Sequence, residues 1–259
     1  MLNIFKASPL LEPESAEWIY DTFAWALSQF DSDEFFQRSR LIQPSNEFFP
    51  GRVDSVHAKA ETIFQHSLNY SGLKHWPFQL VEPQNFLQQL PPSVDNIDLS
   101  RNSKLDNTLP AVQASSPLQV SYNPQQTLKP EDLSSSFAHA LAQYLAMQAT
   151  QAAPGGGEYF AEATEVLGIF MGFGVMFANS AYTFRGSCGR CYNGAANRQA
   201  TLSEDEVIFA LALYCRLKNI STKDATQFLK SHLKSSFKKA SKQIDQQPEQ
   251  LQRLFKFQA

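Results

Sequence analysis

The sequence predicts a mostly α-helical α+β fold in a single domain, and three observations indicate it. The chain has 259 residues, of which 43% are hydrophobic, enough for one large core. Several long segments carry apolar residues at intervals of three and four, which is typical of amphipathic helices. Only two short segments, residues 78–81 and 118–122, have the composition of strands, so the β element is expected to be small.

Two helices and a short strand are expected in the first part of the chain. Residues 15–30 place Trp18, Phe23 and Phe30 at helical spacing and begin with acidic residues, which favour a helix start. Residues 55–70 repeat the apolar pattern. Residues 78–81 follow as a short strand.

An irregular insertion is predicted at residues 82–117, which are rich in Pro, Gln, Asn and Ser and have little periodicity. Because a structureless loop of that length is unusual in a compact domain, we expect some strand structure within it. Residues 118–122 alternate apolar and polar side chains and are predicted to form a strand.

The rest of the chain is predicted to consist of helices. The segments are residues 130–150, a helix that begins near residue 158, residues 203–217 and residues 223–244. The second contains the most apolar stretch, residues 166–178, which is shorter than the ~20 residues that span a bilayer. We therefore expect a buried core helix there and no membrane span.

Charge is distributed unevenly along the chain. The formal net charge is −3, which gives no whole-chain reason to expect nucleic acid as a partner. From Arg216 onward, however, ten Lys and Arg stand against three Asp and Glu, a net of about +7. The basic C-terminal helix 223–244 is thus a candidate surface for an anionic partner, although such a stripe is usually only a solvated face.

The three cysteines are Cys188, Cys191 and Cys215. An odd number without a recognisable signal peptide argues against a disulfide framework and predicts a cytoplasmic location. Cys188 and Cys191 form a Cys-x-x-Cys pair. Together with Cys215 they are candidate zinc ligands in a structural site, a redox pair is an alternative, and two incidental thiols are the simplest interpretation.

Three segments carry a resemblance to known proteins. They are Val120-Ser-Tyr-Asn-Pro-Gln-Gln126, Ser136-Phe-Ala-His-Ala-Leu-Ala-Gln-Tyr-Leu145 and the stretch from Thr164 to Asn179. Together they resemble a family of uncharacterised bacterial zincin-like proteins. Members of that family typically have a strand, a His-Glu-x-x-His helix and then an acidic helix that runs into Gly-x-Gly-x-x-x-x-Ala-Asn. The likeness covers most of residues 14–244 and implies a zincin-like core.

The resemblance also implies that the motif is degenerate. In His-Glu-x-x-His the two histidines bind one zinc ion and the glutamate is the general base for the zinc-bound water. Here His139 matches the first histidine, Ala140 stands at the glutamate position and Gln143 stands at the second histidine position. Alanine accepts no proton, and glutamine is a poor zinc ligand.

The acidic ligand positions of the family are matched only in part. Glu165 corresponds to the second acidic position, whereas the first falls on Ala161, with Glu162 one residue away. The resemblance therefore implies a vestigial site of His139, Ala140, Gln143, Glu162 and Glu165. We expect this site to hold no metal and to retain a hydrogen-bonded pair of His139 and Glu165.

The function expected from the resemblance is that of a catalytically inactive zincin-like protein. It would bind a peptide or partner protein in the former cleft, where strand 118–122 offers an edge beside the His139 helix. Two alternatives stay open. One is a metal-dependent hydrolase that uses His139, Gln143 and Glu162 or Glu165, with Glu158 as base. The other is a structural zinc protein held by the cysteines.

Overall fold

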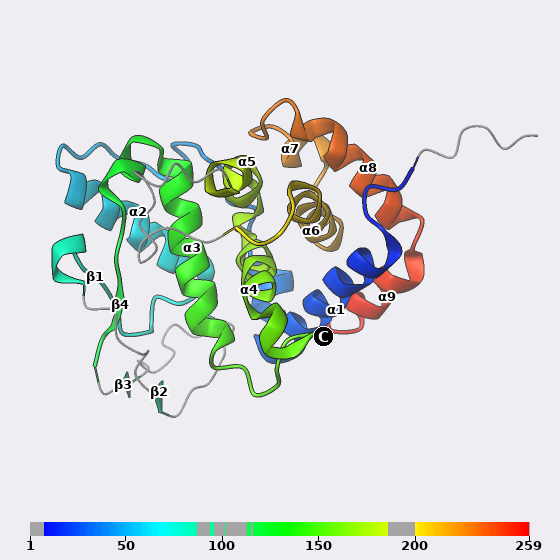
Figure 1. Cartoon of the computed structure of the whole chain (residues 1–259), viewed down its shortest axis with the longest axis horizontal. Coiled ribbons are helices and arrows are strands. Elements are labelled where there is room, and N and C mark those ends of the chain that lie inside the picture. The colour runs from blue at the N-terminus through cyan, green and yellow to red at the C-terminus, as the bar shows by residue number, and fades with distance from the viewer. Residues whose placement is uncertain are drawn as a thin grey trace, which may run out of the picture.

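The computed structural model describes residues 8–86, 94–95, 101, 113–114, 116–185 and 200–258. Within these residues the chain is mostly helical and contains two small two-stranded sheets (Figure 1). The prediction of a mostly helical α+β fold is therefore confirmed. Helix α4 lies in the middle of the molecule, with α2 and α3 on one side and α1, α6 and α8 on the other.

The N-terminal part forms α1 (Pro13–Gln29), a π-helix, η1 (Glu34–Arg38), and α2 (Val56–Ser71). Helix α2 begins where the Ser55 side chain accepts a hydrogen bond from the Ala58 N–H, as an N-cap should. It ends at Gly72, whose φ of +75° is the left-handed conformation typical of a glycine C-cap. Both predicted helices are confirmed, and the π-helix was not predicted.

The two predicted strands pair with each other. Strand β1 (Phe78–Leu80) runs parallel to β4 (Leu118–Val120), with Phe78 opposite Leu118. Within the predicted insertion, β2 (Val94–Asp95) and β3 (Gln113–Ala114) form a short antiparallel pair, so the expectation of some strand structure is confirmed. A 3₁₀ turn, η2 (Pro83–Asn85), follows β1, and most other residues of the insertion lie outside the described ones.

The core is built on two helical segments. One is α3 (Pro130–Ala146), which follows a 3₁₀ turn, η3 (Pro124–Leu128). The other is a helical run from Gly156 to Ala181. The run begins with a 3₁₀ turn, η4 (Gly156–Tyr159), and continues as α4 (Phe160–Gly168), the π-helix η5 (Ile169–Phe173) and the first part of α5 (Gly174–Arg185).

The helical run from Gly156 to Ala181 is 26 residues long and apolar enough to cross a membrane by length and composition. It is longer than the apolar stretch seen in the sequence, so length does not exclude a membrane span here. However, 83% of its most apolar window is buried inside the protein. That burial supports the prediction of a core helix.

A glycine bends this run at η5. Gly172 has a φ of +102°, and its carbonyl accepts a hydrogen bond from the Ile42 N–H. A Cβ at this position would lie 2.2 Å from the Arg40 carbonyl oxygen. Only glycine fits this close approach of two backbones. The contact holds the segment after η1 against the core.

The C-terminal part corrects one prediction. Helix α6 (Glu204–Leu217) begins with a complete capping box of Ser203 and Glu206, as expected. The single helix expected at residues 223–244 is instead two helices, α7 (Thr222–Ala225) and α8 (Leu233–Asp245). A further helix, α9 (Pro248–Phe255), was not predicted.

The break between α7 and α8 has a tertiary cause. The side chain of Asn179 on α5 donates to the Phe228 carbonyl at 2.8 Å and accepts from the Lys230 N–H at 3.0 Å. These backbone groups would otherwise continue a helix. Because both groups are hydrogen-bonded to Asn179, the chain turns between α7 and α8. Helix α8 then packs its buried side chains against α6.

Candidate functional site

The three degenerate motif residues lie where the sequence predicted, on one face of α3. His139 and Ala140 are half-buried, and Gln143, one turn further, is exposed. This face of the helix therefore lies at the edge of the core, with Ala140 packed against it and Gln143 at the surface. Glu158, the candidate base of the hydrolase alternative, is exposed on the 3₁₀ turn before α4.

The two acidic residues of α4 differ in their surroundings. Glu165 is fully buried, and its Oε2 accepts hydrogen bonds from the backbone N–H of Leu202 at 2.9 Å and of Thr201 at 3.3 Å. It thus holds the segment that leads into α6. Glu162 is half-buried, and its Oε2 is shielded from solvent and accepts no hydrogen bond from the described part of the chain. The expected pairing of His139 with Glu165 stays a prediction.

Two of the three predicted cysteine ligands, Cys188 and Cys191, lie outside the described residues. Cys215 is buried on α6, and burial raises the pKa of its thiol to about 12. Since zinc binds the thiolate, this environment is unfavourable for a ligand. Among the residues that the structure describes, no group of three or more His, Cys, Asp or Glu side chains is placed to hold a metal ion.

The strand edge expected to pair with a peptide is already in contact with α3. Leu118 donates to the Pro77 carbonyl and Val120 accepts from the Val81 N–H, so these residues face β1. The carbonyl of Gln119, between them, points the opposite way in a parallel ladder and accepts a hydrogen bond from the Tyr144 hydroxyl at 2.9 Å. This acceptor is therefore not free for an added strand.

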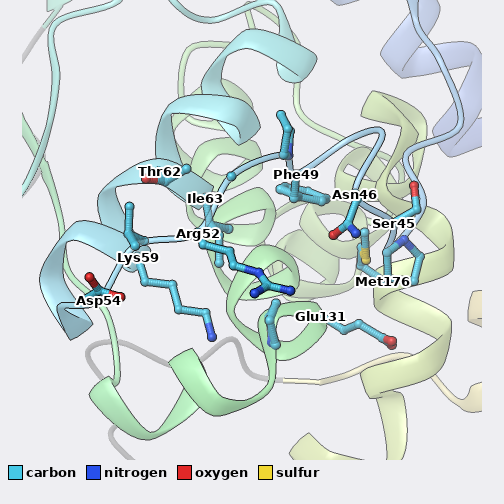
Figure 2. A pocket seen from close by; sticks show the side chains of 15 residues that line it. Ser45, Asn46, Phe49, Arg52, Asp54, Lys59, Thr62, Ile63, Glu131 and Met176 are labelled. Atoms are coloured by element: carbon cyan, nitrogen blue, oxygen red, sulfur yellow. The ribbon is translucent and has the colours of Figure 1, made fainter.

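A pocket of about 550 Å³ lies at the other end of α3, near its first turn (Figure 2). It is enclosed by the loop of residues 44–54, by α2 and by the beginnings of α3 and α5. We call it the 44–54 pocket. Its lining residues are Pro44, Ser45, Asn46, Phe49, Pro50, Gly51, Arg52, Val53, Asp54, Lys59, Thr62, Ile63, Pro130, Glu131 and Met176.

The side chains of Arg52 and Lys59 extend into this pocket (Figure 2), and neither side chain makes an ion pair or a hydrogen bond within the described part of the chain. Glu131, by contrast, accepts a hydrogen bond from the Asn179 side chain at 3.0 Å. The sequence did not predict this site because its residues come from three separate segments. The only local signal is the Pro-Gly turn followed by Arg52, just before the helix cap at Ser55.

A buried charge cluster was missed as well. Arg101 is 1% exposed, and its guanidinium carbon lies 5.1 Å from the centre of the Phe170 ring. Burial raises the pKa of Glu34 and lowers the pKa of Arg101, and the charge of each opposes the shift of the other. The cluster lies between η1 and η5, in the interior.

No protein-family model, no curated protein and no solved structure matches the chain. The likeness to zincin-like proteins therefore stays a prediction from the sequence.

Proposed function

We propose that this chain is a catalytically inactive zincin-like protein that binds a peptide or partner protein. The binding surface is the outward face of α3 and α4 that carries His139, Ala140, Gln143 and Glu162, which we call the motif surface. Its residues correspond to the positions that hold metal and activate water in the family that the sequence resembles.

One observation carries the loss of hydrolysis, namely that alanine and glutamine stand at the positions of the general base and the second histidine. Ala140 and Gln143 thus remove the base and a second ligand at the same place. The Glu165 carboxylate has a structural role as well, because its Oε2 accepts two backbone N–H groups at the start of the α6 segment.

Two features of the motif surface support a binding role. Gln143 is exposed, and its amide can both donate and accept hydrogen bonds. The shielded Oε2 of Glu162 accepts none within the described residues. An arriving N–H group would reach it only after the Glu162 side chain turns outward. A peptide with backbone N–H and C=O groups therefore fits the exposed Gln143 amide directly and Glu162 after this rotation.

Zinc content tests the inactive part of the proposal. Metal content and zinc-dependent peptide hydrolysis are measured for three tag-free proteins. They are wild type, His139→Ala and the double variant Ala140→Glu with Gln143→His. We expect no stoichiometric zinc in the first two and a gain of zinc in the double variant, because the restored histidine lies one turn from His139. Stoichiometric zinc in wild type that is lost in His139→Ala would instead support the hydrolase alternative.

Peptide selection tests the binding part. Peptides are selected from a random displayed library on immobilised wild type and are then titrated against variants. Gln143→Trp and Glu162→Ala should each lower the affinity for the selected peptides by about tenfold or more, which is roughly 1.4 kcal/mol of binding free energy. Lys238→Ala, on the distant helix α8, is the matched control. Equal binding to all variants would place the peptide elsewhere and contradict the proposal.

A further inference from the structure

We propose that the 44–54 pocket binds a small organic anion, a carboxylate or phosphate monoester carried on an apolar or aromatic body. This inference does not rest on the proposed function, because none of the motif-surface residues lines the pocket. The two sites lie at different ends of α3. Each can therefore be tested without the other.

The size of the pocket is that of a small-molecule site. Its volume of about 550 Å³ lies within the range of roughly 300–1,000 Å³ that small-molecule sites occupy. The walls come from three parts of the sequence, namely the 44–54 loop with the start of α2, the first residues of α3, and Met176 of α5. Such a place between packed elements is typical of ligand sites.

The two cations define where the anion sits. Arg52 comes from the loop and Lys59 from the first turns of α2, and Figure 2 shows both side chains extending into the same space. Arg52 is exposed and Lys59 is half-buried, and an anion bound between them would offset the repulsion of the two like charges. Neither has an ion-pair partner among the described residues. An anionic oxygen would receive charge-assisted hydrogen bonds from both.

The carboxylates of the pocket do not supply that anion. Glu131 is held by the Asn179 amide at 3.0 Å, on the side toward α5. In Figure 2 the Asp54 carboxylate does not point toward the Arg52 guanidinium. Neither carboxylate makes an ion pair with Arg52 or Lys59.

The apolar part of the lining favours an apolar or aromatic body next to the anionic group of the ligand. Ile63 and Met176 are buried, with exposures of 5% and 1%, and form an apolar wall. The Phe49 ring packs edge-on against His66 and Tyr70, which holds its orientation. An aromatic or aliphatic body next to the anionic group would bury against these three side chains.

The first half of the 44–54 loop is anchored before any ligand arrives, whereas residues 50–54, which include Arg52, are exposed. The Tyr70 hydroxyl donates to the Phe48 carbonyl, and the Phe48 ring is buried. Just before the loop, the N–H of Ile42 donates to the Gly172 carbonyl. A pocket formed in advance requires less ordering on binding, which favours affinity for a small ligand.

The test is calorimetric titration of the full chain with three probes. They are 2-naphthoate, phenyl phosphate and the uncharged analogue 2-naphthamide. We expect 2-naphthoate and phenyl phosphate to bind, and the amide to bind at least about tenfold more weakly. Arg52→Ala and Lys59→Ala should each weaken both anions by about tenfold or more, and the double variant should abolish binding. Lys238→Ala is the charge-matched control.

Further variants separate the two parts of the pocket. Phe49→Ala should weaken 2-naphthoate more than inorganic phosphate, because only the former uses the apolar wall. Far-ultraviolet circular dichroism and thermal melting check that every variant is folded. The proposal is overturned if wild type binds neither anion, if the amide binds as well as the naphthoate, or if folded Arg52→Ala and Lys59→Ala bind like wild type.

Discussion

The ring of Phe35 is stacked on the ring of Phe170, with centroids 4.5 Å apart and an angle of 12° between their planes. Each belongs to a π-helix, η1 and η5 respectively. The Arg101 guanidinium lies over Phe170, and the Lys218 ammonium lies 5.6 Å from the centre of the Phe35 ring. The two irregular helical segments thus meet through an aromatic pair that contacts a cation at each ring.

The stacked pair should be a major source of stability. Phe35→Ala and Phe170→Ala are each expected to lower the free energy of unfolding by about 3–5 kcal/mol, because both rings are fully buried. Chemical denaturation measures the loss, with Phe255→Ala, a 38% exposed ring, as control. A double-mutant cycle should give a coupling of about 0.5–1.5 kcal/mol. Strict additivity would show that the stacking has no specific contribution.

Removal of the Glu165 carboxylate should destabilise the start of α6. Glu165→Ala leaves the N–H groups of Thr201 and Leu202 without their acceptor, which we expect to cost about 2–4 kcal/mol of unfolding free energy. Glu165→Gln keeps an acceptor oxygen and should lose less. Glu162→Ala is the matched control on the same helix. If Glu165→Ala were as stable as Glu162→Ala, the structural role assigned to Glu165 would be wrong.

Lys218 should make stability depend on pH in the alkaline range. Burial lowers the pKa of Lys218 to about 8, although the charge of Glu34 acts to raise it. The pKa in the unfolded chain stays near 10.5. Between these values the unfolded state binds more protons, so this residue's contribution to stability rises with pH and is least favourable below pH 8.

The comparison of wild type with Lys218→Met isolates this contribution. Burial also raises the pKa values of Tyr20, Tyr214 and Cys215 from 10.0, 10.0 and 9.0, so in both proteins those groups lower stability as the pH rises above about 9 for the cysteine and about 10 for the tyrosines. Denaturation midpoints at a series of pH values should give a difference that changes between about pH 8 and 10.5. A constant difference between the two proteins over that range would contradict the prediction.

The Cys215 thiol should react only when the protein unfolds. It is 1% exposed, and burial raises its pKa to about 12, so little thiolate forms at neutral pH. Alkylation followed by peptide mapping should show slow modification of Cys215 in native protein and fast modification in denaturant. The same measurement on Cys215→Ser identifies the peptide. Fast native labelling at Cys215 would rule out the buried environment.

Local patterns in the sequence predicted most elements correctly. The periodicity of residues 15–30, 55–70 and 130–150 led to α1, α2 and α3, because helix periodicity depends on neighbouring residues alone. The capping box at Ser203 located the start of α6 for the same reason. The motif residues of α3 could likewise be placed on one helix face from their spacing.

Contacts between distant residues settled the rest. The apolar pattern of residues 223–244 suits one helix, yet Asn179 of α5 takes two backbone groups and divides it into α7 and α8. The role of Glu165 depends on a loop more than thirty residues away. Arg52 and Lys59 share a pocket with Met176 only because α2 and α5 pack on α3. Such relationships have no sequence signature, since they arise from which surfaces meet in the folded chain.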